Sequence, residues 1–314
     1  MRIVWESLGY ICAEWLHPQL LPAARHLSGF RELVLTSEME VQLEQMSRAT
    51  LGRMMSRLGK PGIQLPRKGA ESATRRRKGV PMGRISWQMA EPSHFEMDLV
   101  HHGGERTSGE YPHTLQMVDI ATGWSERVSI FGRSGRAVGV GLDRALERLP
   151  FEVKQLHPDN GAEFFNDHLI RYFGQEITGL KLSRSRPFQK NDNRVVEQKS
   201  DTPVRQYIWH GRLDTPEEGG RLDEIYELMW TYYNLFQPVL HLVEKSYETG
   251  RLRTRWDEAR TPYQRLKDTK VLSEDSETRL DKLYRETNPI EFRQQIYRLL
   301  FKLWDSSINQ QTVA

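Results

Sequence analysis

The sequence predicts an α/β protein in which helices cover a mixed sheet of five strands. Two observations carry this prediction. Three strand-like segments follow one another over residues 95–131, and helical and strand-like segments then alternate over residues 134–182. Strands in sequence favour antiparallel neighbours, and alternation of helix and strand favours parallel ones, so together they predict a mixed sheet. Helical segments are expected on both sides, over residues 1–60 and beyond residue 202.

The first strand has two distinct faces. Phe95, Met97 and Leu99 alternate with Glu96, Asp98 and Val100, and a period of two residues is typical of a strand. Two more strands are predicted over 113–120 and 126–131. They are joined by Ala121-Thr122-Gly123, a short glycine-containing connection of the kind found in hairpins.

The segment after these strands alternates between helix and strand. Residues 134–149 place apolar side chains at helical spacing, and residues 151–156 form a short apolar strand. A helix capped by Asn166 or Asp167 and a fifth strand near 180–182 complete the predicted sheet.

The chain ends are predicted to be helical. Ser47 is expected to cap a short helix that carries Arg53 and Arg57 on one flank. That helix either enters a major groove, as in a helix-turn-helix, or closes a small bundle. Trp124, Trp209, Trp230 and Trp256 are expected in the core. The expected organisation is a helical region over 1–60, a basic linker over 61–90, a core of sheet and helices over 91–212 and a helical region over 213–314.

Composition excludes several classes of protein. The 314 residues carry 45 lysines and arginines against 42 acids, a net charge of +3. The single cysteine, Cys12, rules out an intramolecular disulfide and any zinc module that needs several cysteines. No segment approaches the roughly 18 apolar residues of a membrane span. A protein of a reducing cytoplasm, not associated with a membrane, is expected.

The positive charge is concentrated in residues 61–90. Seven basic residues stand there against the single acid Glu71, so this stretch alone carries +6. Frequent proline and glycine predict an extended linker. It is either an arm along DNA phosphates, where cations release condensed counterions, or a solvated hinge. The candidate DNA contacts in it are Arg75, Arg76, Arg77 and Lys78.

Three carboxylates stand out by their places in the predicted elements. Asp98 lies within the first strand, Asp159 just past the fourth, and Glu197 in a segment with helical spacing. A charge within a strand is costly unless it faces solvent or a cation. Oxygen ligands of this kind suit Mg²⁺ or Mn²⁺. Two such ions about 4 Å apart would serve an in-line phosphoryl displacement. A fourth acid, Asp119, is interpreted as part of a strand and its turn, and His157 as a packing residue.

Several motifs resemble the integrase core of DDE transposases, in the branch of bacterial insertion sequences related to retroviral integrases. The likeness runs from about residue 91 to about residue 270. The motifs are Phe95-Glu96-Met97-Asp98-Leu99-Val100, Val118-Asp119-Ile120-Ala121-Thr122-Gly123-Trp124, His157-Pro158-Asp159-Asn160-Gly161, Asn191-Asp192-Asn193, Val196-Glu197-Gln198-Lys199, Asn234-Leu235-Phe236-Gln237-Pro238 and Arg260-Thr261-Pro262-Tyr263.

The resemblance implies an RNase H-like fold in which Asp98, Asp159 and Glu197 hold two divalent ions, Mg²⁺ or Mn²⁺. It implies DNA transposition by 3′-end cleavage and strand transfer, with no covalent protein intermediate. The partners would be duplex DNA, as transposon ends and target, and further copies of the chain as a dimer or larger oligomer. Phosphate contacts are expected at Arg184, Arg186, Lys190, Arg194 and Lys199.

Two departures from the family leave alternatives open. Cys12 alone cannot build the zinc module of retroviral integrases, so a metal-free helical module is expected. Pro203 either breaks the helix that carries Glu197, at about 3 kcal/mol, or lies in the first turn of a new helix capped by Asp201. The alternatives are an RNase H-like nuclease without strand transfer and an inactive DNA-binding protein descended from a transposase. The resemblance also places Met1 within a longer DNA-binding region.

Overall fold

The computed structural model divides the chain into two compact units. Unit 1 combines Met1–Ile63 with Thr231–Ile296, and unit 2 combines Gln64–Trp230 with Tyr297–Ala314. The domain boundaries expected from the sequence remain a prediction. The residues that the structure describes are 1–59, 91–104, 108–158, 164, 180–183, 204, 207–208, 211–248 and 251–313.

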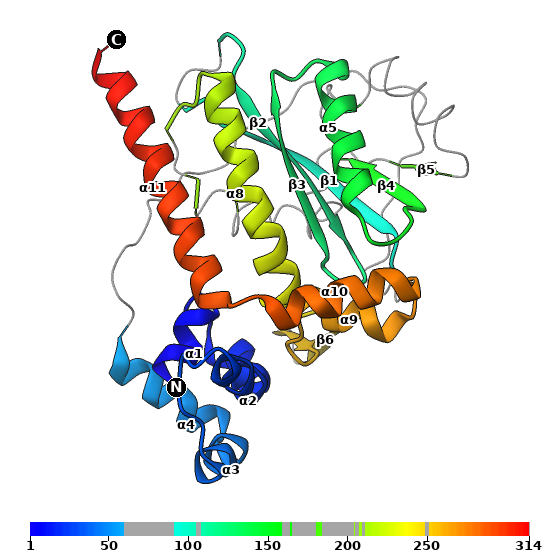
Figure 1. The fold of residues 1–314 in the computed structure, drawn as a ribbon. Helices are drawn as coiled ribbons and strands as arrows, with labels where there is room; N and C mark the ends of the chain where they lie inside the picture. The colour runs from blue at the N-terminus through cyan, green and yellow to red at the C-terminus, as the bar shows by residue number, and fades with distance from the viewer. Residues whose placement is uncertain are drawn as a thin grey trace. The chain divides into compact units, whose positions relative to one another are not determined.

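Unit 2 contains a five-stranded mixed sheet in the order β3-β2-β1-β4-β5 (Figure 1). Strands β1 to β3 are antiparallel, whereas β4 and β5 run parallel to β1. The predicted α/β fold class, a mixed five-stranded sheet with flanking helices, is confirmed. The strands are β1 (His94–His101), β2 (Pro112–Asp119), β3 (Ser125–Phe131), β4 (Gln155–Pro158) and β5 (Lys181–Leu182).

The fourth strand begins later than the sequence predicts, at Gln155 rather than Phe151. Pairing with β1 starts only there: Ser93 O accepts hydrogen bonds from the backbone N–H groups of Lys154 and Gln155. Phe151 is buried for another reason, since its ring stacks on that of Phe95 at 5.8 Å. An apolar residue that anchors a loop therefore resembled the start of a strand.

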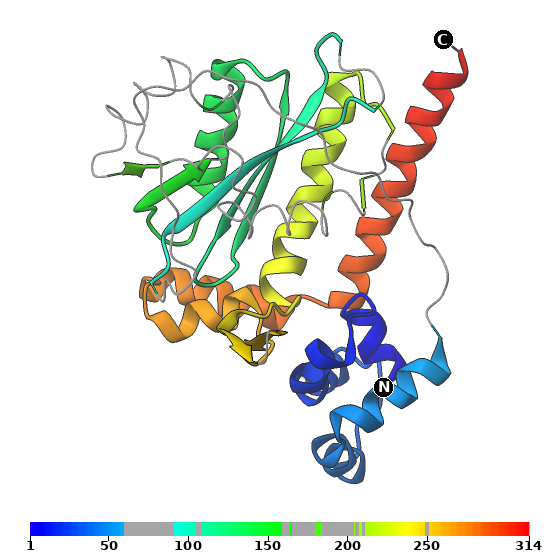
Figure 2. The ribbon, with the colours of Figure 1, turned by 180° about the vertical axis from the view of Figure 1, so that it is seen from behind.

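Two helices contact opposite faces of this sheet (Figures 1 and 2). Helix α5 (Gly135–Arg148) lies within the predicted range 134–149, is capped by Ser134 and lies close to β3. A Cβ added at Gly141 would come within 2.4 Å of Ile130 Cγ2, so only glycine permits this approach. Helix α8 (Pro216–Leu235) contacts the other face through Tyr226, which hydrogen bonds to Thr114.

The N-terminal helices pack against C-terminal segments within unit 1. Tyr232 Oη donates to Ser7 O at 2.9 Å, Gln237 Nε2 donates to Leu8 O at 2.9 Å, and His26 Nε2 lies 2.9 Å from Thr287 O. The predicted helical character of residues 1–60 is confirmed in the described part. The first four helices are α1 (Arg2–Ser7), α2 (Ala13–Gly29), α3 (Ser37–Gln45) and α4 (Arg48–Leu58), the last capped by Ser47 as predicted.

The C-terminal region is mostly helical, as predicted for 213–314, but one hairpin interrupts its helices. An antiparallel hairpin, β6 (Leu242–Glu248) and β7 (Arg251–Trp256), lies between α8 and α9 (Pro262–Thr269). The core prediction for Trp256 is wrong, because it lies on this hairpin and is 41% exposed. Trp124 is fully buried as predicted, and Trp209 lies outside the described residues.

The last part of the helical region consists of two helices, α10 (Glu274–Glu286) and α11 (Pro289–Val313). The break has a local cause. Pro289 has no backbone N–H and is tolerated only in a first turn, while Asn288 Oδ1 accepts from Ile290 N and caps the second helix. Among the described helices, none combines the length and the apolar character that a bilayer crossing requires.

Candidate functional site

Asp98 lies in the middle of β1, on the face that α8 also contacts. Its neighbours Met97 and Leu99 point to the other face and are buried. Asp98 itself is half-buried, and its Oδ1 accepts a hydrogen bond from Leu99 N at 2.9 Å. Within the described ranges, no lysine, arginine or histidine forms an ion pair with this carboxylate. A carboxylate within a strand is costly unless solvent or a cation stabilises it, and the partial exposure of Asp98 leaves it accessible to both.

A row of polar residues crosses the sheet from Asp98. Asp98 pairs with Gln116 on β2, and Gln116 pairs with Arg127 on β3. Both partners are almost completely buried, at 0% and 2% exposure. Arg127 Nη2 donates to Ser125 Oγ at 3.0 Å. The sequence analysis did not single out Gln116 or Arg127. Gln116 lies between Leu115 and Met117 in β2, which was an available signal, whereas Arg127 follows Glu126 in β3 and had no such pattern.

The strand β4 leads directly from the sheet toward Asp159. In the parallel register, Glu96 pairs with His157 and Met97 with Pro158, and Asp159 follows Pro158 in the sequence. His157 is fully buried, and its Nδ1 lies 2.8 Å from Ser183 Oγ, just past β5. The packing role predicted for His157 is therefore confirmed.

Most of the predicted site residues lie outside the described residues. Of the proposed triad, the structure describes Asp98 and not Asp159 or Glu197. In the part of the chain that is described, no cluster of three or more metal-binding side chains is present. The predicted DNA contacts outside the described residues are Arg75, Arg76, Arg77, Lys78, Arg184, Arg186, Lys190, Arg194 and Lys199, and so is Pro203.

Both carboxylate oxygens of Asp119 accept hydrogen bonds within the fold, which confirms its interpretation as part of a strand and its turn. Its Oδ1 accepts from the backbone N–H groups of Ser93 and His94, at 2.8 and 3.1 Å. Its Oδ2 accepts from the backbone N–H and the hydroxyl of Thr122, at 2.9 and 2.7 Å. Since Asp119 is fully buried and both oxygens accept two hydrogen bonds, it has no coordination site left for a metal ion.

Glu126 is a second buried acid with a structural role. Its Oε1 accepts from the indole N–H groups of Trp124 and Trp230, at 2.9 and 2.6 Å, and its Oε2 lies 3.5 Å from Arg148 Nε. Burial raises the pKa of Glu126 to about 7, against the opposing effect of Arg148. This carboxyl group joins β3, α5 and α8 within unit 2 and does not face solvent.

The raised pKa of Glu126 predicts a stability that falls with pH. Between its ordinary pKa near 4.5 and about 7, the folded protein holds this proton and the unfolded chain does not. Raising the pH through that window therefore destabilises the folded state, on the order of 2 kcal/mol for this group. Glu126→Gln keeps the acceptor for both indoles and removes the titration, so the variant should lose less stability than wild type between pH 5 and pH 8. Urea unfolding of both proteins across that range measures the difference, and parallel curves would contradict the assignment.

Comparisons with known proteins place the chain in a family. No family model matches the sequence. Among solved structures, the catalytic core domain of BIV integrase is similar at 19% identity, over 35% of this chain and 64% of that chain. The TM-score of that match is 0.28, and a likeness of this size says nothing about activity. Among curated proteins, the uncharacterized protein y4rM of Sinorhizobium fredii (strain NBRC 101917 / NGR234) is 35% identical over 249 residues, which are 77% of this chain and 69% of that protein. The chain therefore belongs to the family of y4rM.

Proposed function

We propose that this protein is a DNA transposase that cuts and joins DNA strands with two divalent metal ions held by Asp98, Asp159 and Glu197. The observation that carries the proposal is the environment of the Asp98 carboxylate. It is a half-buried carboxylate in the middle of β1, without an ion-pair partner among the described residues, on a polar face of a five-stranded mixed sheet. The order and spacing of the surrounding motifs support the same activity.

The register of β1 and β4 supports the pairing of Asp98 with Asp159. Pro158, the last residue of β4, pairs with Met97, and Asp98 and Asp159 are the next residues of the sequence after these two. In open sheets, ligand chemistry gathers where parallel strands end. Two carboxylates on adjacent strands at such an edge form the start of a site for hard cations. We place Glu197 as the third ligand from the resemblance alone.

The donor chemistry fits a divalent metal ion. Asp98 offers a hard carboxylate oxygen, and among the described residues Leu99 N donates a hydrogen bond to it. The two other acids discussed above do not compete for that role, since Asp119 is saturated and Glu126 is enclosed. When bound, the ions would lower the pKa of an attacking oxygen and neutralise charge on the phosphate.

The proposed reaction is a pair of phosphodiester displacements. A water oxygen attacks phosphorus at the transposon end, the bond to the 3′ oxygen breaks, and that oxygen leaves as a hydroxyl group. The freed 3′-hydroxyl then attacks a target phosphodiester, loses its proton to solvent, and displaces the 3′ oxygen of the target strand. The protein would position the three carboxylates around the metal ions and align both DNA strands, and no side chain becomes covalently attached to DNA.

We further propose that the partners are duplex DNA, as transposon end and as target, and a second copy of the chain. Joining two ends to one target requires two active sites, which favours a dimer or a larger oligomer. Basic residues along the linker and around Glu197 would contact phosphates, which positions DNA without reading its sequence.

A joining assay tests the proposed function. Purified protein, with Mg²⁺ or Mn²⁺, is given a labelled duplex from the DNA that flanks the coding region, together with a second unlabelled duplex. Covalent transfer of the label to the second duplex is expected. Cleavage without transfer would favour a nuclease instead, and binding with neither activity would favour an inactive DNA-binding protein.

The basic linker gives a separate prediction. Replacing Arg75, Arg76, Arg77 and Lys78 with serine removes four cations that we assign to phosphates. The dependence of log affinity on log salt should then flatten by about 3.6, since each contact contributes about 0.9. Fluorescence anisotropy on a labelled duplex from 50 to 200 mM salt measures the slope, and an unchanged slope would make residues 61–90 a plain hinge.

A further inference from the structure

The hairpin β6–β7 is rich in arginine. Residues 242–256 hold four basic residues against two acids, a net charge of +2, and β7 alone holds three arginines and no acid. Arg251, Arg253 and Arg255 occupy alternate positions of β7, which places them on one face of the strand. They pair in register with Glu248, Ser246 and Glu244.

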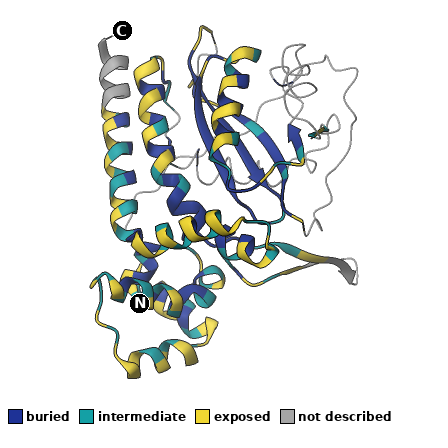
Figure 3. Cartoon of the chain, turned by 45° about the vertical axis from the view of Figure 1, so that its right-hand side comes forward, coloured by how far each residue is buried: buried dark blue, intermediate teal, exposed yellow. Residues whose placement is uncertain are grey.

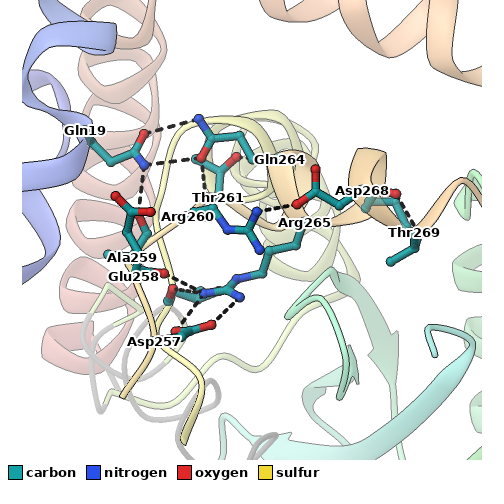
Figure 4. Close-up of polar contacts among 12 residues, drawn as sticks. Gln19, Asp257, Glu258, Ala259, Arg260, Thr261, Gln264, Arg265, Asp268 and Thr269 are labelled. Atoms are coloured by element: carbon teal, nitrogen blue, oxygen red, sulfur yellow. Dashed lines mark hydrogen bonds and ion pairs between the residues drawn. The ribbon is translucent and has the colours of Figure 1, made fainter. Parts of the chain in front are cut away.

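An ion pair between the buried Arg265 and the half-buried Asp257 fixes the base of this hairpin (Figure 4). Arg265, only 5% exposed, donates to both oxygens of Asp257, at 2.6 and 3.0 Å, and to Val239 O at 2.8 Å. Asp257 Oδ1 also accepts from His241 N at 2.7 Å, and Asp257 N donates to His241 O at 2.9 Å. Arg265 on α9 therefore connects the residues just before β6 with the residue just after β7, and so holds the two ends of the hairpin together.

The Arg265–Asp257 ion pair is important because a two-stranded ribbon is marginally stable by itself in water. Bidentate pairing of a buried arginine with a carboxylate is among the stronger polar contacts. The described part of the hairpin is exposed nonetheless. Val243 and Trp256 are 39% and 41% exposed, and the side chains of Glu244 and Arg255 are 56% and 64% exposed. Figure 3 shows the hairpin extending away from the neighbouring helices, with its described part coloured mostly as exposed or intermediate. A ribbon that is held at its base and exposes side chains there has the form of a binding arm.

We propose that this ribbon binds the phosphate backbone of duplex DNA through Arg251, Arg253 and Arg255. The inference rests on the proposed function, which supplies DNA as the substrate. Charge complementarity selects the occupant: alternate arginines along a strand match a chain of phosphates, and a two-stranded ribbon fits the major groove in width. Trp256, exposed beside Arg255, adds an aromatic surface at the base of the arm.

Glu244 reduces the positive charge of this arginine face. It forms an exposed ion pair with Arg255, at 3.1 Å between Oε2 and Nε. Such a pair is worth little in water, and DNA phosphate would compete for the same guanidinium. Removing the acid should therefore favour DNA, which gives the proposal a variant that binds more tightly than wild type.

The test measures affinity for a labelled duplex against salt in the full chain. Replacing Arg251, Arg253 and Arg255 with serine should weaken binding at least about tenfold at 0.1 M salt and flatten the log–log slope by about 2.7. Glu244→Gln should tighten binding about twofold or more, a gain that misfolding cannot mimic. The matched control replaces Arg279, Lys282 and Arg285 with serine, since these three exposed cations lie on α10 in the same unit. That control should keep most of the wild-type affinity.

The outcomes separate this proposal from the proposed function. If wild type binds and joins DNA but the arginine variant keeps its affinity and slope, the ribbon has no role in DNA binding. The same holds if the control on α10 loses as much affinity as the ribbon variant, or if Glu244→Gln binds no more tightly than wild type. If the arginine variant keeps DNA binding and loses affinity for an acidic protein, the partner is a protein and the proposal is wrong. If wild type binds no DNA at all, the proposed function fails and the ribbon proposal fails with it.

Discussion

Asp98→Asn is expected to abolish both DNA cleavage and strand joining while DNA binding and folding are retained. Asparagine keeps the shape of the side chain and the acceptor for Leu99 N, but it removes the negative charge that would hold a divalent ion. A metal ion contributes several kcal/mol of charge stabilisation in the transition state, so the rate should fall at least about 10³-fold. Single-turnover cleavage and joining of labelled duplexes measure this loss.

The matched control for Asp98→Asn is Glu152→Gln, which neutralises an exposed acid outside the sheet. It should cut and join DNA at the wild-type rate. Asp159→Asn and Glu197→Gln should behave like Asp98→Asn, since the proposal gives all three the same role. Wild-type joining by any one of the three triad variants would remove that residue from the catalytic site.

Asp119→Ala is expected to produce the largest loss of stability of any single change in unit 2. It deletes four hydrogen bonds and leaves three backbone N–H groups and one hydroxyl without their acceptor. Leaving buried donors unsatisfied costs about 1–3 kcal/mol each, and the losses at one site are not additive. We expect about 3–5 kcal/mol in the free energy of unfolding, measured by urea denaturation at pH 7.

A milder change separates this structural role from catalysis. Asp119→Asn keeps one acceptor oxygen and should lose roughly half as much stability as Asp119→Ala. Below its melting temperature it should still cut and join DNA, because Asp119 has no role in holding a metal ion. A stable but inactive Asp119→Asn protein would show that the acid belongs to the catalytic site after all.

Local patterns predicted the central sheet because its strands are specified locally. Alternation in β1, the glycine at 123 with φ of 76° and the cap at Ser134 are all short-range signals. The hairpin β6–β7 escaped prediction for the opposite reason. A two-stranded ribbon needs support, and here Arg265 supplies it from α9, beyond the end of the ribbon. That contact depends on the tertiary structure.

The sequence predicted one described residue of the candidate site, Asp98, but not the neighbours of Asp98 in the sheet. The position of Asp98 followed from strand period and motif resemblance, and the structure places it where expected on β1. Gln116 and Arg127 were not predicted as its neighbours, because a strand pattern does not give the register between strands. A shift of one residue would have turned both side chains to the opposite face.

The most direct test of the account is to locate the metal ion itself. Iron(II) replaces Mg²⁺ in many oxygen-ligand sites, and with ascorbate and peroxide it cuts the polypeptide near the bound ion. The account predicts a backbone cut close to residue 98 that is suppressed by excess Mg²⁺ and lost in Asp98→Asn, but kept in Glu152→Gln. No cut near residue 98, or a cut that persists in Asp98→Asn, would contradict it.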